Sequence, residues 1–302
     1  MHTPSQRHFR GKIKRFHKSI LFMLIAYASI VIMGVFVKVS SSNIPPSQIL
    51  FFRFFIGLLF ILPFVFNSSQ FNFKMHNFKY SLLRNAAGLL SMLLMFYSLK
   101  YLPVSTAILL TNTSTLFVPL FMLLIFKSRA SWSTILCTVL GFAGICIIFY
   151  TPQAEISSLY LSIGVLSAAF AALAYIGIKQ LSKDHSSLEI IFYFYASSSI
   201  AIPLFTAYGW VWPSWTDTLS LLMVGIFGLA FQIFITKAFK LSDISEITPF
   251  IFTGVILSAL SDWLVWSNAP SGRFWVGAAV IVLSVSLLAK LKTPEQTATL
   301  PR

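Results

Sequence analysis

One apolar stretch of the sequence, LLTNTSTLFVPL (109–120), contains five consecutive side chains that can form hydrogen bonds: Thr111, Asn112, Thr113, Ser114 and Thr115. Groups of this kind can hold a polar solute by hydrogen bonding. They can also serve packing, because Ser and Thr hydroxyls bond to a carbonyl one turn back and let helices approach closely. The stretch therefore indicates either a binding surface or a helix contact inside an apolar environment.

Helical geometry favours binding for part of this stretch. A helix turns about 100° per residue, so five successive side chains point in all directions and some must face the interior of a bundle. Asn112, Thr115 and Pro119 share one stripe. We therefore predict that Thr111, Asn112 and Thr115 line a cavity and contact a polar solute, with Asn112 as the main candidate.

A second candidate lies in EITPFIFTGV (246–255), which contains Pro249 and Thr253. Proline lacks a backbone donor and frees a carbonyl one turn earlier. In transporters, a membrane helix interrupted by Pro or Gly points to the binding site. The alternative is a kink that serves packing alone, and the sequence leaves both interpretations open.

Four ionisable side chains lie within apolar runs, where each is costly unless it is paired or hydrated. Arg53 has two open interpretations, a cavity or gating residue and an interfacial anchor. Lys38 and Arg84 lie near the ends of their runs and are expected to snorkel to the membrane surface. Asp262 is expected to pair with Arg53 or Lys38, either as a gate or as a structural bridge.

Tyrosines inside apolar runs also need hydrogen-bond partners, and we predict that Tyr97 and Tyr175 line the cavity. The sequence contains no phosphate-binding loop, no metal-ligand spacing and no nucleophile–base arrangement. We therefore expect a protein that is not an enzyme and that uses no cofactor or metal. Because ATP-binding motifs are also absent, any transport would be secondary.

Composition indicates where these side chains must operate. The 302 residues are 57% hydrophobic and only 10% charged, and the mean hydropathy is +0.83. A soluble domain would have roughly a quarter charged residues, so the chain reads as a membrane protein. The net charge of +14 does not indicate nucleic acid, because the basic residues gather in the N-terminal segment and in loops.

About 20 apolar residues cross a bilayer as a helix. Ten runs fit: 19–40, 46–66, 80–100, 103–126, 131–150, 157–180, 187–209, 217–239, 244–266 and 273–291. The basic start resembles a signal peptide, but the first run is long enough to favour a retained span. Lys and Arg concentrate in alternate loops, and the positive-inside rule then predicts that both termini are cytoplasmic.

The two halves of the chain resemble each other at an offset of about 140 residues. IMGVFVK ends at Lys38 and LAYIGIK ends at Lys179, and Pro63 corresponds to Pro203. Each half then has five spans, and an odd number requires the second half to enter the membrane from the opposite side. We predict an all-α membrane protein with ten transmembrane helices arranged as two inverted five-helix repeats around a central cavity.

Two long segments resemble the EamA-type members of the drug/metabolite transporter superfamily. They are LLRNAAGLLSMLLMFYSLKYLPVSTAILLTNTSTLFVPLFMLL and AFKLSDISEITPFIFTGVILSALSDWLVWSNAPSGRFWVGAAVIVLS. Within the first segment, the Leu-Leu-Arg start of the third span and the Phe-Tyr-Ser-Leu-Lys-Tyr end of that span are most similar to the S-adenosylmethionine uptake subgroup. The resemblance implies a ten-helix carrier of the inner membrane. A Gly-Glu pair that the family often carries in both repeats is missing at 126–131 and 266–272, so no role of those glutamates transfers.

These observations define the expected organisation. A basic cytoplasmic tail (1–18) precedes a first EamA-like repeat (19–150), and a second repeat (157–291) precedes a cytoplasmic C-terminal tail (292–302). The expected partners are a small-molecule substrate and the lipid bilayer, without nucleic acid, in a monomer or homodimer.

The expected function is secondary transport of a small polar metabolite across a bacterial-type inner (plasma) membrane, with S-adenosylmethionine uptake implied by the resemblance. An exporter of amino acids or drugs and a carrier of organic anions are the alternatives on the same fold. A membrane-embedded enzyme or a scaffold that does not transport is a further alternative. It would need a catalytic cluster on one water-accessible side, and the sequence contains none.

Overall fold

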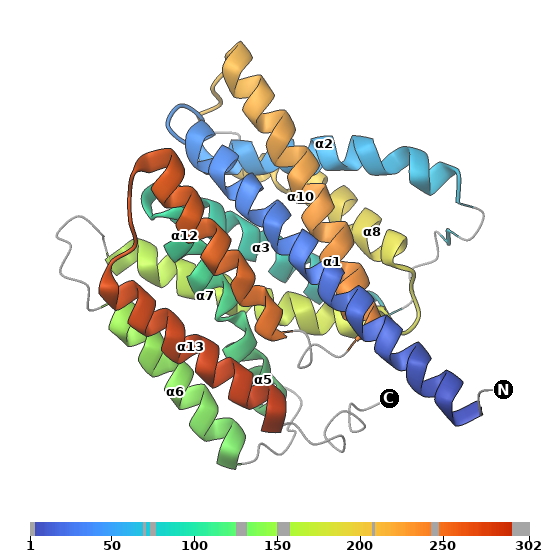
Figure 1. The fold of residues 1–302 in the computed structure, drawn as a ribbon. Helices are drawn as coiled ribbons and strands as arrows, with labels where there is room; N and C mark the ends of the chain where they lie inside the picture. The colour runs from blue at the N-terminus through green and yellow to red at the C-terminus, as the bar shows by residue number, and fades with distance from the viewer. Residues whose placement is uncertain are drawn as a thin grey trace.

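A computed structural model describes residues 4–68, 71–72, 77–124, 132–149, 158–206, 209–242 and 248–291, and every regular element in these ranges is helical (Figure 1). The elements are α1 (Pro4–Ser40), α2 (Pro46–Phe66), α3 (Phe78–Tyr101), α4 (Val104–Asn112), α5 (Ser114–Leu124), α6 (Trp132–Phe149), α7 (Ser158–Leu181), α8 (Ser187–Ala201), α9 (Pro203–Thr206), α10 (Trp215–Leu241), the 3-10 helix η1 (Thr248–Phe252), α12 (Thr253–Trp266) and α13 (Gly272–Leu291).

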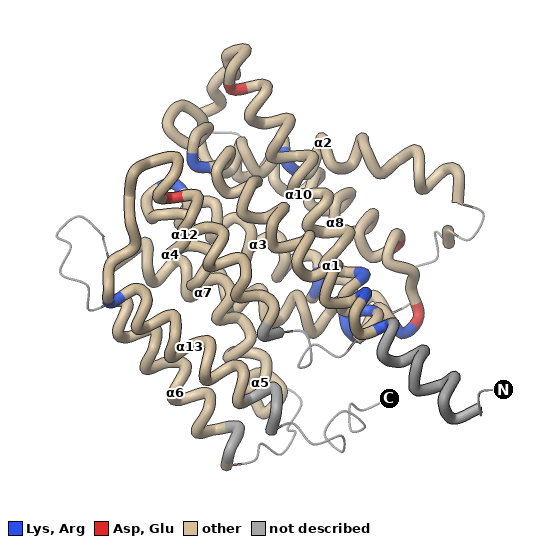
Figure 2. The backbone as a smooth tube through the Cα atoms, viewed as in Figure 1, with Lys and Arg blue, Asp and Glu red and all other residues tan. Residues whose placement is uncertain are grey.

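Within the described residues, seven helical segments are long and apolar enough to cross a membrane: Arg15–Ser40, Pro46–Phe66, Phe78–Tyr101, Val104–Leu124, Ser158–Leu181, Ser187–Thr206 and Trp215–Leu241. Three shorter apolar helices correspond to the remaining predicted spans: Ile135–Ile148, Phe250–Trp266 and Gly272–Leu287. Figure 2 shows that Lys, Arg, Asp and Glu are rare along the middle parts of the helices. The predicted membrane protein with an all-helical fold is therefore confirmed.

Several predicted spans differ from the structure in their limits. The first helix continues back through the basic segment to Pro4. The span predicted at 187–209 is interrupted before Pro203, because proline lacks a backbone donor and disfavours helical conformation in the residue before it. The limits predicted at 126, 131, 150, 157 and 244, and the C-terminal tail 292–302, lie outside the described residues.

Two helices begin with reciprocal side-chain caps. The Ser186 hydroxyl accepts from the Glu189 amide while the Glu189 carboxylate accepts from the Ser186 amide. The same arrangement joins Ser214 and Asp217 at the start of α10. Because each cap satisfies donors that a helix N-terminus leaves unpaired, it fixes where α8 and α10 begin.

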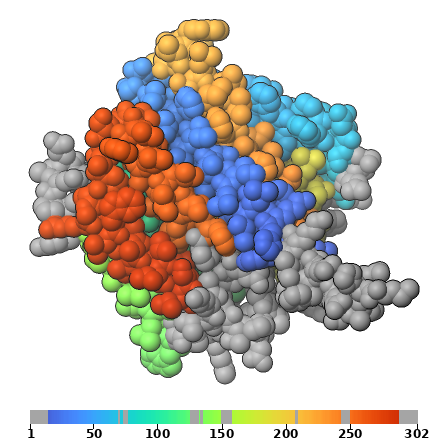
Figure 3. All heavy atoms as spheres, viewed as in Figure 1, coloured from blue at the N-terminus to red at the C-terminus, as the bar shows by residue number. Residues whose placement is uncertain are grey.

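Contacts between helices show how the chain is arranged. In the α6–α13 pair, the Ser284 hydroxyl donates to the Cys137 carbonyl, whereas Gly144 lies against Gly277. Residue numbers therefore rise along one helix as they fall along the other, and the two helices are antiparallel. On the face shown in Figure 3, α13, α12, α1 and α10 lie side by side.

Candidate functional site

A small internal cavity lies between α1, α3, α4, α7, α8 and α10 and encloses about 30 Å³. This volume accommodates about one or two water molecules, so a metabolite can enter only when the surrounding helices separate. Apolar side chains form much of the lining, as is usual for a ligand pocket. Seven polar side chains complete it: Tyr27, Arg84, Ser91, Thr111, Asn112, Tyr175 and Gln232.

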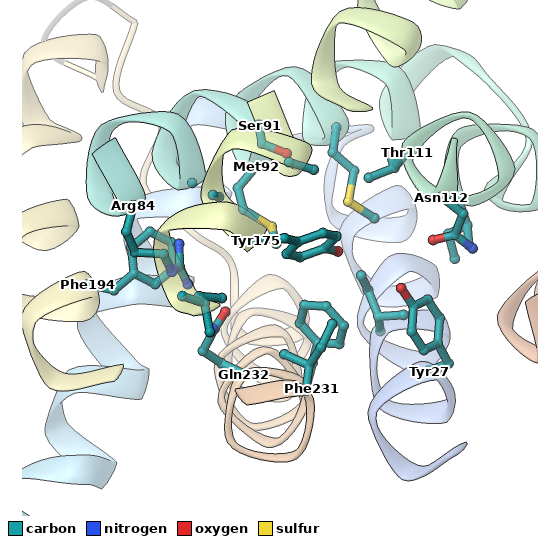
Figure 4. A pocket seen from close by; sticks show the side chains of 18 residues that line it. Tyr27, Arg84, Ser91, Met92, Thr111, Asn112, Tyr175, Phe194, Phe231 and Gln232 are labelled. Atoms are coloured by element: carbon teal, nitrogen blue, oxygen red, sulfur yellow. The ribbon is translucent and has the colours of Figure 1, made fainter. Parts of the chain in front are cut away.

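The polar groups are divided between two ends of the cavity (Figure 4). Arg84 and Gln232 lie at one end, beside Phe194. Asn112 lies at the other end, and the Tyr27 and Tyr175 hydroxyls point toward each other. Since Arg84 is the only charged residue among the described residues of this lining, the cavity combines one cationic end with one neutral hydrogen-bonding end.

Arg84 is held in place by packing. Its guanidinium carbon lies 3.9 Å from the centre of the Phe194 ring, a distance typical of a cation–π contact. A Cβ on Gly88 would fall 2.1 Å from an Arg84 terminal nitrogen, so the side chain lies directly over this glycine. The expectation that Arg84 snorkels to the membrane surface is wrong, because the residue is only 3% exposed and lines the cavity.

The polar run 111–115 coincides with a break between α4 and α5. The Thr113 amide is shared between the Leu109 and Leu110 carbonyls at 3.2 and 3.1 Å. The next turn tightens, because the Leu116 amide donates to the Thr113 carbonyl at 2.8 Å. The Thr113 hydroxyl donates to the Leu110 carbonyl at 2.6 Å. Thr113 thus supplies hydrogen bonds to backbone groups at the break between α4 and α5.

Asn112 is the residue of this run that reaches the second half of the chain. The side-chain amide of Asn112 donates to the Ile251 carbonyl in η1 at 3.4 Å, and the backbone carbonyl of Asn112 accepts from the Thr115 hydroxyl at 3.2 Å. Asn112 also lines the cavity, as does Thr111. The structure therefore brings two of the three predicted residues to the cavity, whereas Thr115 serves the helix break.

The break between α4 and α5 has a counterpart where η1 meets α12. Pro249 belongs to η1, and the Thr253 hydroxyl donates to the Phe250 carbonyl at 2.7 Å at the start of α12. The contact between Asn112 and Ile251 shows that the two interrupted helices meet. Irregular backbone at membrane depth is tolerated where it is buried in protein or lines a cavity.

Three further candidates lie outside the described lining of the cavity. Thr253 bonds within its own helix start. Tyr97 is half-buried and packs against the apolar core. Arg53 is fully buried, against Phe54 and Tyr195. Of the predicted tyrosines, only Tyr175 contributes to the lining.

Lys38 and Asp262 hold the turn between α3 and α4. The Lys38 ammonium donates to the Leu102 carbonyl at 2.5 Å. The Asp262 carboxylate accepts from the Val104 and Ser105 amides at 2.9 and 2.7 Å. We call this arrangement the α3–α4 clamp.

The clamp changes the interpretation of Asp262. The sequence predicts a pair with Arg53 or Lys38, and Lys38 does interact electrostatically with Asp262. The hydrogen bonds of the carboxylate go instead to the free amides at the N-terminus of α4, where negative charge is favourable. The contact also fixes direction, because Asp262 near the end of α12 meets the start of α4. Asn112 at the end of α4 meets η1, so α4 and α12 are antiparallel.

Arg84, Gln232 and Phe194 are among the lining residues that were not assigned to the site from sequence. Arg84 was assigned to the membrane surface, and Gln232 and Phe194 were not singled out. Gln232 could have been found by the signal used for Asn112, because it is an amide inside the apolar run GLAFQIFI. Phe194 has no such signal among the many aromatic residues of the chain.

A bundle of apolar helices, with a buried cavity that holds a few polar side chains beside the interrupted α4, suits a membrane transport protein. The chain belongs to the EamA-like transporter family, whose model matches residues 17–150 and 158–290. This confirms the predicted EamA-type membership. The protein is thus an integral protein of a bacterial membrane.

Characterised relatives are transporters with different substrates. The pseudopaline exporter of Pseudomonas aeruginosa is 31% identical over 90% of this chain and 96% of its own length. The S-adenosylmethionine uptake transporter of Rickettsia prowazekii is 25% identical over 89% of this chain and 92% of its own length. A solved crystal structure that is 17% identical in sequence matches 89% of this chain and 96% of its own chain, with a TM-score of 0.63. That likeness concerns the fold alone.

Proposed function

We propose that the protein is a secondary transporter that moves a small polar metabolite bearing a carboxylate across the inner membrane by alternating access. The observation that carries the proposal is the buried cavity, which has Arg84 at one end and Asn112 at the other. A volume of about 30 Å³ is too small for a metabolite. The cavity therefore corresponds to a closed conformation, from which the helices separate toward one side or the other.

Two inverted five-helix repeats, 19–150 and 157–291, account for the arrangement of helices. Helices at matching places in inverted repeats run in opposite directions, as do α4 with α12 and α6 with α13. The helix break at Thr113 and the start of α12 at Thr253 are also separated by about the repeat offset. In this proposal ten helices cross the membrane, and the two breaks meet near its midplane.

The cavity lining favours a solute that carries an anionic group. A guanidinium matches a carboxylate with two parallel hydrogen bonds, and Arg84 has no acidic neighbour among the described lining residues. S-Adenosylmethionine is one candidate, because its carboxylate suits Arg84 and its adenine suits the aromatic lining. Export of an amino acid or a drug is the second candidate, and the 31% identity with the pseudopaline exporter favours export as the direction.

Thermal unfolding of the purified protein with a metabolite panel tests the proposal, followed by uptake into proteoliposomes. S-Adenosylmethionine, amino acids, organic acids and uncharged analogues form the panel. We expect stabilisation by solutes with a free carboxylate, and no stabilisation by their amides. Stabilisation by amides as strong as by the acids would contradict the role given to Arg84.

The membrane orientation is tested with single cysteines at Ser42 and Lys183. Both positions are exposed, in the loops α1–α2 and α7–α8, and they occupy matching places in the two repeats. Because the basic loops predict cytoplasmic termini, Ser42→Cys should react with a membrane-impermeant thiol reagent in whole cells. Lys183→Cys should react only after permeabilisation. Labelling of both from one side is incompatible with inverted repeats.

Asn112 is tested by comparison with its neighbour. Asn112→Leu should keep the fold but raise the apparent KM about 2- to 13-fold, because a polar solute loses one hydrogen bond. Thr113→Val should change transport much less, since the Thr113 hydroxyl bonds to the Leu110 carbonyl of its own chain segment. Equal losses in the two variants would assign the run 109–120 to helix packing.

A further inference from the structure

Arg53 on α2 is the most unusual charged group in the described part of the protein. The residue is 0% exposed, and none of its three guanidinium nitrogens forms a hydrogen bond within the described residues. Its neighbours are aromatic, with the guanidinium carbon 4.8 Å from the Phe54 ring centre and 5.7 Å from that of Tyr195. Such contacts compensate a buried charge only in part.

The charge on Arg53 has no evident structural use. Arginine stays protonated in proteins, so it cannot escape the cost of burial by losing a proton. The buried carboxylates of the described residues are engaged elsewhere: Asp262 in the α3–α4 clamp, and Glu189 and Asp217 in helix caps. An isolated charge within a membrane bundle points to a role with a ligand or an ion.

Glycines provide the space that both interior arginines occupy. A Cβ on Gly228 of α10 would fall 2.8 Å from the Arg53 Nε. A Cβ on Gly88 would likewise meet the Arg84 guanidinium. A Cβ on Gly177 of α7 would fall 2.9 Å from the Arg84 Cβ. Any larger residue would displace either arginine, so both positions depend on their glycines.

Arg53 lies just beyond the wall of the cavity. Gly228, on which it packs, is one helical turn before Gln232, and Gln232 lines the cavity beside Arg84. The wall between the two arginines is aromatic: Phe54 contacts Phe194 at 5.1 Å between ring centres, and Phe194 covers Arg84. A shift of α8, which carries Phe194, would join the two cations into one chamber.

We propose that Arg53 and Arg84 form a two-cation site for a solute with two separate anionic groups. Arg84 binds one anionic group in the cavity described above, and Arg53 binds the second when α8 moves. Two groups, carboxylate with carboxylate or carboxylate with phosphate, match two guanidinium forks separated by an aromatic wall. This inference rests on the proposed function, because it assumes that the cavity receives the transported solute. It narrows that proposal to dianionic solutes and so disfavours S-adenosylmethionine, which has a single carboxylate.

The test compares dianions with monoanions of the same size. Purified protein is titrated with the α,ω-dicarboxylates from succinate to adipate, with their monomethyl esters and with 3-phosphonopropionate, and affinity is read from thermal unfolding. We expect at least one dianion to bind about tenfold or more tightly than its matched monoester, because a second charge-assisted interaction is gained. Preference for 3-phosphonopropionate over the dicarboxylates would identify the second group as a phosphate type.

Variants assign this preference to Arg53. Arg53→Gln should bind the dianion and its monoester equally, while still binding the monoester as the wild type does. Gly228→Ala keeps the charge but displaces Arg53, and should reduce the preference in the same way. Gly225→Ala is the packing control: its new Cβ would meet Ile56 of α2 at 2.5 Å and not Arg53, so it should lower stability without changing the preference.

The outcomes separate the two-cation site from the proposed function. A wild type that binds esters and diacids equally, or an Arg53→Gln variant that keeps the full preference, overturns the two-cation site. Binding of the monoester at Arg84 would leave the proposed transporter intact in both cases. If Arg84→Gln and Asn112→Leu change the binding of no solute, the cavity is not the binding site and both proposals are wrong.

Discussion

Arg84→Gln should lower the initial rate of transport about 100-fold while the protein still inserts and purifies normally. The arginine places a buried cation at one end of a cavity whose described lining has no other charge. Loss of its charge-assisted hydrogen bonds to an anionic group costs about 3 kcal/mol, which corresponds to a factor of about 100. Uptake into proteoliposomes at a fixed low solute concentration measures the effect.

Two matched variants define what the loss means. Lys79→Gln removes a cation from the exposed start of the same helix and should leave transport nearly unchanged. Arg84→Lys keeps the charge but not the planar fork that binds a carboxylate at two points, so it should recover only part of the rate. Normal transport by a well-expressed Arg84→Gln protein would leave Arg84 with a packing role over Phe194.

The positions of the helices could be predicted largely from the sequence, because long apolar runs in this composition have few alternatives to membrane helices. The breaks were harder to predict. Proline marks the end of α8 before Pro203, but nothing in the local sequence places a break at Thr113 rather than nearer Pro119. That position depends on tertiary contacts, including the one from Asn112 to Ile251.

Only part of the candidate site could be predicted from the sequence, and the reason is similar. Depth along a helix can be read from sequence, whereas the side of the helix that faces the protein cannot. The position of Arg84 near the end of its apolar run predicts a surface location, but Gly88 and Gly177 on the protein-facing side make room for it inside the bundle. For Asp262 the prediction assumed a charged partner, but free amides at a helix N-terminus satisfy a carboxylate equally well.

Asp262→Ala should destabilise the protein more than any other single change proposed here, and it should open the side of the bundle where α4 begins. The carboxylate is 1% exposed and accepts two amide hydrogen bonds from the start of α4. Removal leaves these amides unpaired in an apolar environment, at a cost of about 2–5 kcal/mol. Thermal unfolding of the purified variant measures this loss.

A second measurement separates a gate from a structural bridge. In a background without Cys137 and Cys146, the Asn112→Cys thiol lies in the cavity and reports access from outside the cell. If the α3–α4 clamp closes that side, Asp262→Ala should destabilise the closed state relative to the open state by about 1.4 kcal/mol or more. The open population, and with it the rate of labelling by a membrane-impermeant reagent, should then rise about tenfold or more.

Ser214→Ala provides the control for this measurement. Ser214 caps α10 within its own chain segment, by accepting from the Asp217 amide, and its loss should cost about 1 kcal/mol of stability. Among the described residues, the hydrogen bonds of Ser214 stay within 214–218 and join no pair of helices as Asp262 joins α12 to α4. Labelling of Asn112→Cys should therefore not accelerate. If Asp262→Ala lowers stability with no faster labelling, Asp262 is a structural bridge, and the gate must lie elsewhere.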